Sequence, residues 1–330
     1  MILGIESTAH TFGVGVVDNG KILANVKSSY TTEKGGIIPV ESAKHHEKVK
    51  EQVYNEALEK ACIKEQQIKA IAFSQGPGLS PCLLVGLNFA KELARRLNLP
   101  LIPVNHCIAH LEIGKITGAK DPVLLYASGA NTQIISYSSG KYRIFGETLD
   151  IGVGNFIDTF ARYAGLGFPG GPKIAELAEK ERKKGKVEYI ELPYSVKGMD
   201  VAFSGILTNL KQKLESKKYS LEQLSYSLEE TSFAMLIEAA ERALAHLNKS
   251  ELLLGGGVAC NKRLQKMCKI MCKERNAKFF VPENSLLVDN GTMIAFLGEI
   301  MFNSGLGVEP DEADFNPRQR TDDVKVSWKL

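Results

Sequence analysis

Short apolar runs and longer amphipathic stretches alternate along the chain, and their order is repeated. Residues 2–17 hold two apolar runs separated by a Ser/Thr/His turn, and a third run covers residues 22–28. Residues 123–138 have the same pattern, and a third strand is predicted for residues 142–150. Apolar runs of this length, bounded by turn residues, are typical of β-strands and hairpins. Each half of the chain therefore begins with three predicted strands.

Helix-period segments and further strands follow both hairpins in one order. In the first half, helix, strand, helix, strand and helix are predicted at residues 41–61, 70–74, 82–97, 101–105 and from 106. In the second half, after inserted helices, the same order is predicted at residues 220–247, 252–254, 259–275, 278–281 and from 289. This alternation predicts an α/β fold with mainly parallel sheets, whose ligands bind beyond the carboxyl ends of the strands. Two facing copies would share one cleft; the alternative is a single large α/β domain with accidental similarity.

Composition and charge favour a globular enzyme of about two domains. The chain has 330 residues, of which 44% are hydrophobic and 24% charged, and its formal net charge of +3 does not by itself indicate nucleic-acid binding. No run approaches the ~18 apolar residues of a membrane-spanning helix, and the chain enters its first strand without a basic leader. Six cysteines without a CxxC pair are typical of a reducing compartment. We therefore expect a cytoplasmic enzyme with no membrane partner.

The sequence HCIAH, directly after a predicted strand, is a candidate metal-binding motif. On a helix, His106 and His110 lie one turn apart on one face, within reach of a single ion. The repeat places Asp289 at the start of the corresponding second-half helix and Tyr126 at the end of that half's opening strand. Nitrogen and oxygen ligands of this kind suit iron or zinc. The alternatives are one capping and one core histidine, and an ordinary N-cap aspartate.

Three small, polar or glycine-rich turns could approach a phosphate group with backbone N–H groups. They lie at residues 6–10, 128–132 and 254–261, and the last contains a triglycine that leads into a helix. The chain contains neither GxxxxGK nor GxGxxG, which excludes the P-loop and Rossmann fingerprints. One such turn is weak support, but three at one predicted cleft favour a bound nucleotide.

Carboxylates and basic runs in the second half each have a functional and a structural interpretation. The turn at residues 167–172 leads into a helix with Glu176, and Asp158 comes shortly before the turn. Such carboxylates can bind ribose hydroxyls or be plain surface groups. The basic runs 180–186 and 211–218 could contact RNA phosphates or be solvated helix faces.

Eight motifs in combination resemble the universal TsaD/OSGEP family in its archaeal–eukaryotic branch. They cover nearly the whole chain and are GIESTAHTFGVGVV, SQGPGLSPCLLVG, HCIAHL, YASGANTQI, FPGGPKIAELA, AFSGILTNL, GGGVACN and LLVDNGTMIA. The resemblance implies the actin/Hsp70/sugar-kinase (ASKHA) fold, in which duplicated ribonuclease-H-like subdomains enclose a central nucleotide cleft. Together with the repeat, it predicts subdomains 1–120 and 121–304, the second with helical insertions, and a C-terminal extension 305–330.

The resemblance also implies site residues. One divalent ion per subunit, iron or zinc, would be held by His106, His110, Tyr126 and Asp289. The adenylate site would consist of Tyr126, Ala127, Ser128, Gly129, Ala130, Asp158, Gly171, Glu176 and Asn261. His10, on the first polar loop, is a candidate proton acceptor. Bacterial relatives differ from this chain at Tyr126 and His10, where it follows the archaeal–eukaryotic pattern.

The activity implied by the resemblance is a group transfer to RNA. The threonylcarbamoyl group would pass from threonylcarbamoyl-adenylate to N6 of the adenosine next to the anticodon of tRNAs that read ANN codons, with release of AMP. Members of this branch work in the KEOPS complex with a small protein kinase and other small subunits, and some archaeal members continue into a fused kinase. The alternatives are an ATP-dependent sugar or acid kinase of the same fold, a metallopeptidase without the HExxH motif, and a non-catalytic nucleotide-binding scaffold.

Overall fold

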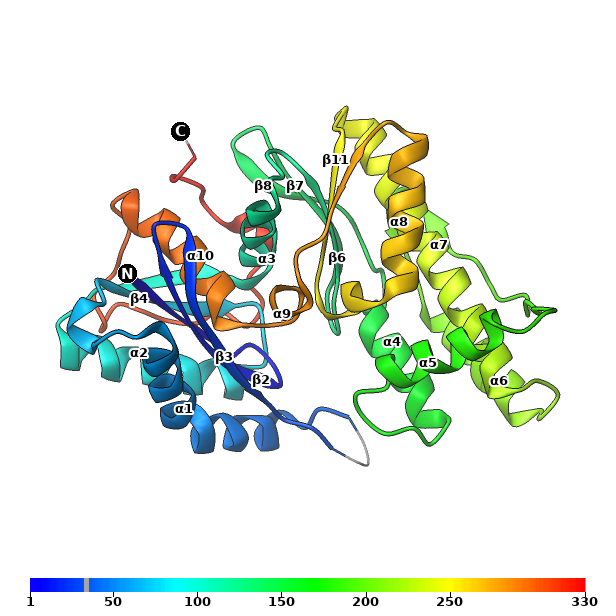
Figure 1. The fold of residues 1–330 in the computed structure, drawn as a ribbon, viewed down its shortest axis with the longest axis horizontal. Helices are drawn as coiled ribbons and strands as arrows, with labels where there is room; N and C mark the ends of the chain where they lie inside the picture. Colours follow the sequence, from blue (N-terminus) through cyan, green and yellow to red (C-terminus); the bar gives the residue numbers. More distant parts are fainter. Residues whose placement is uncertain (33–35, 330) are drawn as a thin grey trace.

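Two five-stranded mixed sheets of the same topology form the centre of the molecule (Figure 1). The computed structural model describes residues 1–32 and 36–329. The first sheet consists of β1 (Ile2–Glu6), β2 (Thr11–Asp18), β3 (Lys21–Ser29), β4 (Ala70–Gly76) and β5 (Leu101–Asn105). The second consists of β6 (Val123–Ala127), β7 (Thr132–Ser138), β8 (Lys141–Glu147), β11 (Glu251–Gly255) and β12 (Lys278–Phe280). The orders β3-β2-β1-β4-β5 and β8-β7-β6-β11-β12 match, which confirms the predicted duplication.

Helices cover the outer face of each sheet. The first half contains α1 (Pro39–Ala61), α2 (Ser80–Leu97) and α3 (His106–Gly114). The second half contains α4 (Val153–Tyr163), α5 (Gly171–Arg182), α6 (Ser204–Glu215), α7 (Leu221–Leu247), α8 (Lys262–Glu274), α9 (Asn284–Leu287) and α10 (Gly291–Asn303), with a short ribbon of β9 (Val196–Lys197) and β10 (Asp200–Val201). In Figure 1, α1 and α2 lie with the first sheet and α4 to α8 with the second. Within the described residues, no helix combines the length and apolar character needed to cross a membrane.

A third hydrophobic core lies between the two sheets and is built around α3 and α10. The helix α10 packs on β1 and β2, although it comes at the end of the second half, and α3 packs on α10 and β11. We call the first sheet with α1 and α2 the first lobe, and the second sheet with α4 to α8 the second lobe. Because α3 and α10 lie between the lobes, each lobe covers its inner face partly with the other half's chain. The division at residues 120 and 304 stays a prediction.

The contact between α10 and the first sheet depends on glycines. A Cβ atom at Gly4 would lie 2.2 Å from the backbone nitrogen of Ala295, and one at Gly15 would lie 2.3 Å from that of Thr292. A Cβ at Gly291 would lie 2.4 Å from the backbone nitrogen of Gly15. These distances leave no space for a side chain. The backbones of the helix and the strands therefore touch directly.

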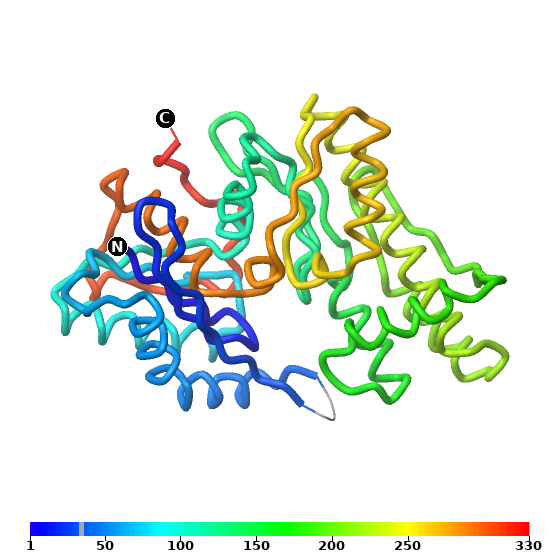
Figure 2. The backbone as a smooth tube through the Cα atoms, in the orientation of Figure 1, coloured from blue at the N-terminus to red at the C-terminus, as the bar shows by residue number. Residues whose placement is uncertain are grey.

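The C-terminal segment 305–329 packs on both lobes. Val308 pairs with Leu101 at the edge of the first sheet. Further on, the indole of Trp328 stacks on Tyr142 of β8, with ring centroids 6.4 Å apart. Figure 2 shows these last residues, coloured red, beside the teal β7–β8 hairpin. Leu330, the end of the predicted extension, lies outside the described residues.

Three of the differences between predicted and observed element boundaries have a cause that the structure shows. The strand predicted for residues 142–150 ends at Glu147, because Asp150 turns back and accepts hydrogen bonds from the N–H groups of Phe203 and Ser204. The helix predicted from residue 259 begins at Lys262, after a 3₁₀ turn η3 (Gly257–Cys260). The last helix begins at Gly291 and not at Asp289, because Asn290 is its N-cap.

Candidate metal centre and nucleotide cleft

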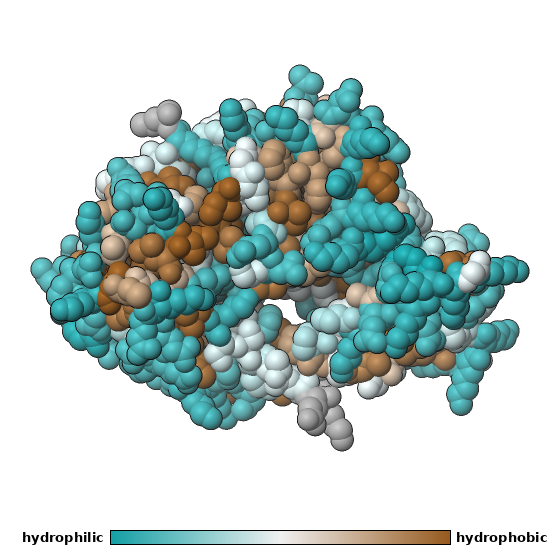
Figure 3. Space-filling model, in the orientation of Figure 1, coloured by the Kyte–Doolittle hydropathy of each residue, from teal (hydrophilic) through white to brown (hydrophobic). Residues whose placement is uncertain are grey.

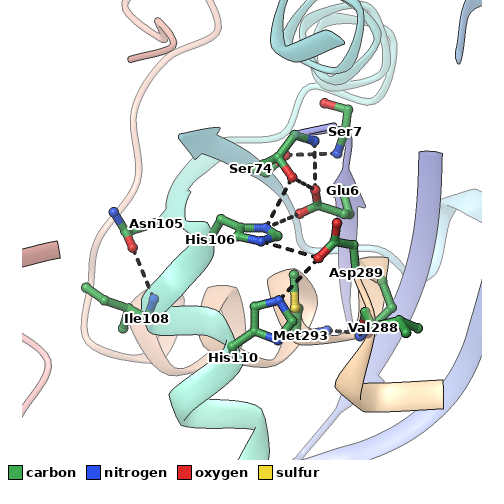
Figure 4. Close-up of polar contacts among 12 residues, drawn as sticks. Glu6, Ser7, Ser74, Asn105, His106, Ile108, His110, Val288, Asp289 and Met293 are labelled. Carbon is green, nitrogen blue, oxygen red and sulfur yellow. Dashed lines mark hydrogen bonds and ion pairs between the residues drawn. The ribbon is translucent and has the colours of Figure 1, made fainter. Parts of the chain in front are cut away.

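The helix α3 presents its two histidines to the interior between the lobes. The strand β5 ends at Asn105, whose side chain accepts a hydrogen bond from the N–H of Ile108 at 3.0 Å and so caps α3. His106 and His110 are 3% and 2% exposed, and their ring centroids lie 4.8 Å apart. Figure 4 shows both imidazoles on the same side of the helix. The predicted placement of the pair on one helix face is therefore confirmed.

Asp289 reaches the same place from the second half of the chain. Its Oδ1 lies 3.4 Å from Nε2 of His106 and 3.4 Å from Nε2 of His110. The predicted alternative, an ordinary N-cap role for this aspartate, is wrong: the side chain of Asn290 accepts the hydrogen bond from the N–H of Met293 at 2.9 Å. Because Asn290 caps α10, the carboxylate of Asp289 is available to the histidines.

Tyr126 completes the group of four side chains that the sequence predicted to lie together. It lies one residue before the end of β6, at the carboxyl edge of the second sheet, and is fully buried. Its hydroxyl lies 3.0 Å from Nε2 of His106, and its ring centroid is 4.8 Å from that of His110. The structure thus brings together two imidazoles, a phenol and a carboxylate from three separate chain segments.

Glu6 is a residue of this cluster that the sequence analysis did not assign. It is fully buried at the end of β1, and its Oε2 lies 3.0 Å from Nδ1 of His106. Its Oε1 accepts a hydrogen bond from the N–H of Thr8 at 2.7 Å. A carboxylate in this place holds the proton of His106 on Nδ1 and leaves Nε2 free to bind. The only sequence signal was an acidic residue at the end of an otherwise apolar strand.

The ionisation of the cluster follows from its close packing. Burial opposes charge on His106, but Tyr126, Glu6 and Asp289 outweigh it and raise the pKa of this imidazole well above its ordinary value. For Asp289, burial alone would raise the pKa, but His106 and His110 lower it well below its ordinary value. Burial lowers the pKa of His110. The cluster therefore offers an ionised carboxylate and a neutral imidazole, and a cation at His106 would displace a proton.

These donors fit a divalent transition-metal ion. One ligand atom from each of His106, His110 and Asp289 lies within 4.8 Å of the other two. The set of imidazole nitrogen and carboxylate and phenol oxygen suits zinc or iron. Glu6 supplies the outer hydrogen bond that orients a ligating histidine. Among the described residues, this is the only such group of histidine, cysteine and acidic side chains.

The loop between β6 and β7 continues directly from Tyr126. The carbonyl of Ser128 accepts the N–H of Gly154 at 3.0 Å, and that of Gly129 accepts the N–H of Asn155 at 2.9 Å, so the loop lies on the first turn of α4. Ala127 is buried and Ala130 is exposed. A Cβ at Gly256 would lie 2.3 Å from the carbonyl oxygen of Ala127. The triglycine turn and this loop are therefore in contact, as the predicted cleft requires.

Asp158 and Gly171 also lie together. Oδ1 of Asp158, on α4, accepts a hydrogen bond from the N–H of Gly170 at 2.8 Å, one residue before α5 begins at Gly171. Burial raises the pKa of Asp158, although the backbone N–H groups of Gly170 and Gly171 and, to a smaller degree, His10 of the first lobe oppose this rise. His10 lies edge-on to Phe168, with ring centroids 5.7 Å apart. Asp158 therefore lies at the boundary between the lobes.

Two of the predicted adenylate residues have other partners in the structure. The carboxylate of Glu176 is exposed and forms an ion pair with Lys180 at 2.9 Å. The Asn261 side chain caps α8 by accepting from the N–H of Arg263 at 2.8 Å, and its amide donates to the buried carboxylate of Glu229 at 2.5 Å. Both ends of the Asn261 side chain are thus engaged.

The two lobes enclose a hollow that opens to solvent (Figure 3). At one rim the N–H of Phe168 donates to the carbonyl of Thr32 at 3.3 Å, which joins the lobes. A cavity of about 340 Å³ beside this contact is lined by both lobes: Thr31, Thr32, Gly165, Leu166, Gly167, Phe168 and Lys173. A cleft of this kind can hold a nucleotide-sized ligand.

Similar solved structures have the expected fold. The chain superimposes on HypF of Thermococcus kodakarensis with a TM-score of 0.64 at 16% identity, covering 94% of this chain and 48% of that one. It superimposes on (R)-2-hydroxyglutaryl-CoA dehydratase component A of Acidaminococcus fermentans with a TM-score of 0.57 at 13% identity, covering 90% and 97%. These similarities confirm the expected actin/Hsp70/sugar-kinase fold.

Comparisons of sequence indicate the family. A tRNA N6-adenosine threonylcarbamoyltransferase of Thermococcus sibiricus is 54% identical over 326 residues, 99% of each chain. A probable bifunctional tRNA threonylcarbamoyladenosine biosynthesis protein of Methanosarcina mazei is 53% identical over 99% of this chain, which spans 59% of that protein. Residues 21–296 match the family described as "TsaD: tRNA N6-adenosine threonylcarbamoyltransferase". The chain therefore belongs to the TsaD family of tRNA N6-adenosine threonylcarbamoyltransferases.

Proposed function

We propose that this enzyme transfers the threonylcarbamoyl group from threonylcarbamoyl-adenylate to N6 of the adenosine next to the anticodon of tRNAs that read ANN codons. Family membership supports the transfer to tRNA. The observation that carries the proposal at atomic level is the convergence of His106, His110, Asp289 and Tyr126 directly before the β6–β7 loop. An ion site and a phosphate-binding loop on one strand end could hold both ends of an aminoacyl-type adenylate.

The ion-binding side of the proposed site consists of the two imidazoles, the carboxylate of Asp289 and the phenol of Tyr126. A bound divalent ion would act as a Lewis acid toward an oxygen of the threonine moiety and fix its position. Glu6 holds His106 in one tautomer and orientation. The surrounding core excludes water, because His106, His110 and Tyr126 are almost completely buried.

The nucleotide side of the proposed site consists of backbone groups and carboxylates. The N–H groups of residues 129 and 130 and of the triglycine turn would bind the phosphate, since the N–H of Ser128 already donates to the carbonyl of Asn131. Asp158 uses one oxygen to hold Gly170, and its other oxygen would accept from a ribose hydroxyl. Gly171 and the residues near Asn261 would line the adenosine pocket. Glu176 could contact the adenylate only after its ion pair with Lys180 breaks.

The reaction needs positioning more than strong acid or base chemistry. The N6 amine attacks the carbonyl carbon of the threonylcarbamoyl group, a C–N bond forms, and the C–O bond to the phosphate breaks. AMP leaves with that electron pair, and the amine loses a proton, for which His10 is the candidate acceptor. Holding the amine and the carbonyl in reactive orientation lowers the barrier chiefly through proximity and electrostatic stabilisation.

The proposed macromolecular partners are tRNA, a small protein kinase and further small subunits of a KEOPS-type complex. The Methanosarcina mazei relative is named as a bifunctional protein, and this chain spans 59% of it. We also propose the division into subdomains 1–120 and 121–304 with the extension 305–330, with α3 and α10 exchanged in packing between them.

The test is an assay of the modified nucleoside. Purified enzyme is mixed with threonylcarbamoyl-adenylate and tRNA, with and without the partner proteins, and the nucleoside is scored by mass. The double substitution His106→Ala with His110→Ala should abolish modification and bound metal while the circular dichroism spectrum stays unchanged. The control His246→Ala changes an exposed histidine of α7 and should keep activity. Normal modification by the double variant would contradict the metal role, and phosphorylation of a small molecule by ATP would favour a kinase.

A further inference from the structure

The helix α8 carries a stripe of lysines on its outer face. Lys262, Lys266, Lys269 and Lys273 are exposed, and their spacing of four, three and four residues places them in one row along the helix. The opposite face, with Leu264, Cys268, Met271 and Cys272, is buried in the core of the second lobe. The burial pattern therefore holds the row of ammonium groups toward solvent.

These four lysines differ from those of residues 180–186, the first of the two basic runs predicted from the sequence. In that run, Lys180 pairs with Glu176, Lys183 with Glu179 and Lys184 with Glu181. Within the described residues, none of the four α8 lysines forms an ion pair; Lys262 donates only to the neutral amide oxygen of Gln265 at 3.3 Å. Most of the charge of the run 180–186 is therefore locally neutralised, whereas the charge of the α8 row is not.

The row begins at the cleft. Its first member follows Asn261, and η3, which precedes α8, contacts α9 at the centre of the molecule. Burial raises the pKa of the Cys260 thiol, and the charges of Lys27 and Lys262 lower it in part. Lys27 belongs to the other lobe.

The position of Lys27 follows from the register of the first sheet. It lies opposite Gly13 in the β2–β3 ladder, and opposite residues of an antiparallel pair share a face. A Cβ at Gly13 would lie 2.9 Å from the backbone nitrogen of Gly291, so this face meets the start of α10 beside Asp289. Lys27 is exposed and, within the described residues, has no ion pair. Lys27 therefore places a further ammonium group on the first-lobe side of the cleft, on the sheet face that meets the start of α10.

We propose that Lys27 and the α8 row of Lys262, Lys266, Lys269 and Lys273 form the track on which the phosphate backbone of the RNA substrate lies as its target adenosine enters the cleft. This inference rests on the proposed function, because it assumes an RNA substrate. Unpaired lysines in a row are suited to phosphates, since they bind as flexible point charges and release counterions.

Charge and composition favour RNA over a protein partner. Protein interfaces are depleted of lysine and carry apolar or aromatic residues at their centre. The α8 face offers Ile270 as its one large exposed apolar side chain among the four lysines. In Figure 3, teal, hydrophilic atoms cover much of the second lobe, with smaller brown patches among them. The track also leads to the proposed reaction centre. A path for the substrate must reach that centre, whereas a separate docking surface for a protein need not.

The salt dependence of RNA binding tests the track. The triple variant Lys266→Gln, Lys269→Gln, Lys273→Gln is compared with the intact chain for binding of an unmodified tRNA transcript that reads an ANN codon, at several salt concentrations. Loss of three phosphate contacts should make the slope of log K against log salt less steep by about 2–3 and weaken binding at low salt. The matched control Lys180→Gln, Lys183→Gln, Lys184→Gln removes the same charge from the same lobe and should leave the slope unchanged.

The outcomes separate this proposal from the proposed function. An unchanged slope in the α8 variant, or an equal change in both triple variants, overturns the track. AMP binding should be equal in all three proteins, and a loss of AMP binding in the α8 variant would show a damaged cleft and overturn the assignment to RNA. If the intact chain binds tRNA with the predicted slope difference but never forms the modified nucleoside, the proposed function fails while the track stands.

Discussion

The helices α3 and α10 close their respective halves of the duplicated fold, but they bring chemistry to the centre in different ways. Each begins after an asparagine that caps it, Asn105 for α3 and Asn290 for α10. The first residue of α3 is His106, which carries a candidate ligand, whereas the first residue of α10 is Gly291, which carries none. The second half instead offers Asp289, one residue before its cap.

Packing explains the difference. A Cβ at Gly291 would lie 2.4 Å from the backbone nitrogen of Gly15 and 2.6 Å from the carbonyl oxygen of Gly4, so this position has no room for a side chain. The start of α3, by contrast, faces the gap between β6 and α10, where an imidazole fits. A duplicated framework thus repeats strands, helices and caps, while the space around each equivalent position decides which residue can carry a ligand.

Removing the second half's ligand should have the largest effect. Asp289→Asn keeps the size of the side chain but removes the charge that faces both imidazoles. Loss of an outer-sphere partner typically weakens metal binding by about 10–100-fold. Because Asp289 is a candidate ligand itself, we expect a larger loss of zinc affinity, together with loss of tRNA modification. Zinc titration measures the effect, and Asp311→Asn, an exposed acid paired with Arg95, is the control. Wild-type zinc affinity would show that the two halves do not share one ion site.

A side chain at the first position of α10 should disrupt the framework itself. Gly291→Ala forces a Cβ against the backbone of β1 and β2, and we expect a loss of unfolding free energy of about 3 kcal/mol. Gly205→Ala in α6 is the matched control, because its Cβ would have no heavy atom within 4 Å. That control should gain about 0.5–1 kcal/mol from helix propensity. Urea unfolding compares them, and equal stability of the two variants would contradict the steric explanation.

Glu6 gives the first half a support that the second lacks, since the strand equivalent to β1 ends in Ala127. Glu6→Gln should weaken zinc binding by about 10–100-fold, because a neutral amide orients His106 less strongly. The control is Glu181→Gln, which changes another buried carboxylate. In the same titration it should bind zinc with the affinity of the unsubstituted protein. A wild-type affinity for Glu6→Gln would mean that the helix alone orients His106.

The two caps should contribute equally. Asn105→Ala and Asn290→Ala each remove a side-chain acceptor from a buried helix start, and each should lower the unfolding free energy by about 1–2 kcal/mol. The corresponding serine variants retain an acceptor and should lose less. Chemical denaturation of the four variants measures this, and a cost at only one of the two positions would show that the helices are not equivalent.

Much of this molecule could be derived from local sequence. Alternating apolar runs predicted the hairpins that open both halves, and the Asn-Gly turn after β2 has the positive φ angles that such a turn needs. The spacing of His106 and His110 placed them on one helix face, and the repeat brought Asp289 and Tyr126 to the same cluster. Strand and helix periods, turns and motif spacing depend on neighbouring residues, so they are legible in the chain itself.

Only the tertiary structure decided which distant groups meet. Nothing near Glu6 in the sequence indicated a bond to His106, and Asn290, not Asp289, proved to be the cap of α10. The pairing of the lysines is, by contrast, a local matter: Lys180, Lys183 and Lys184 meet carboxylates three or four residues away in the sequence, while the α8 lysines form no ion pair within the described residues. Contacts such as the bond between Glu6 and His106 join residues that are far apart in the chain. They are set by how the sheets and helices stack, which local periodicity does not encode.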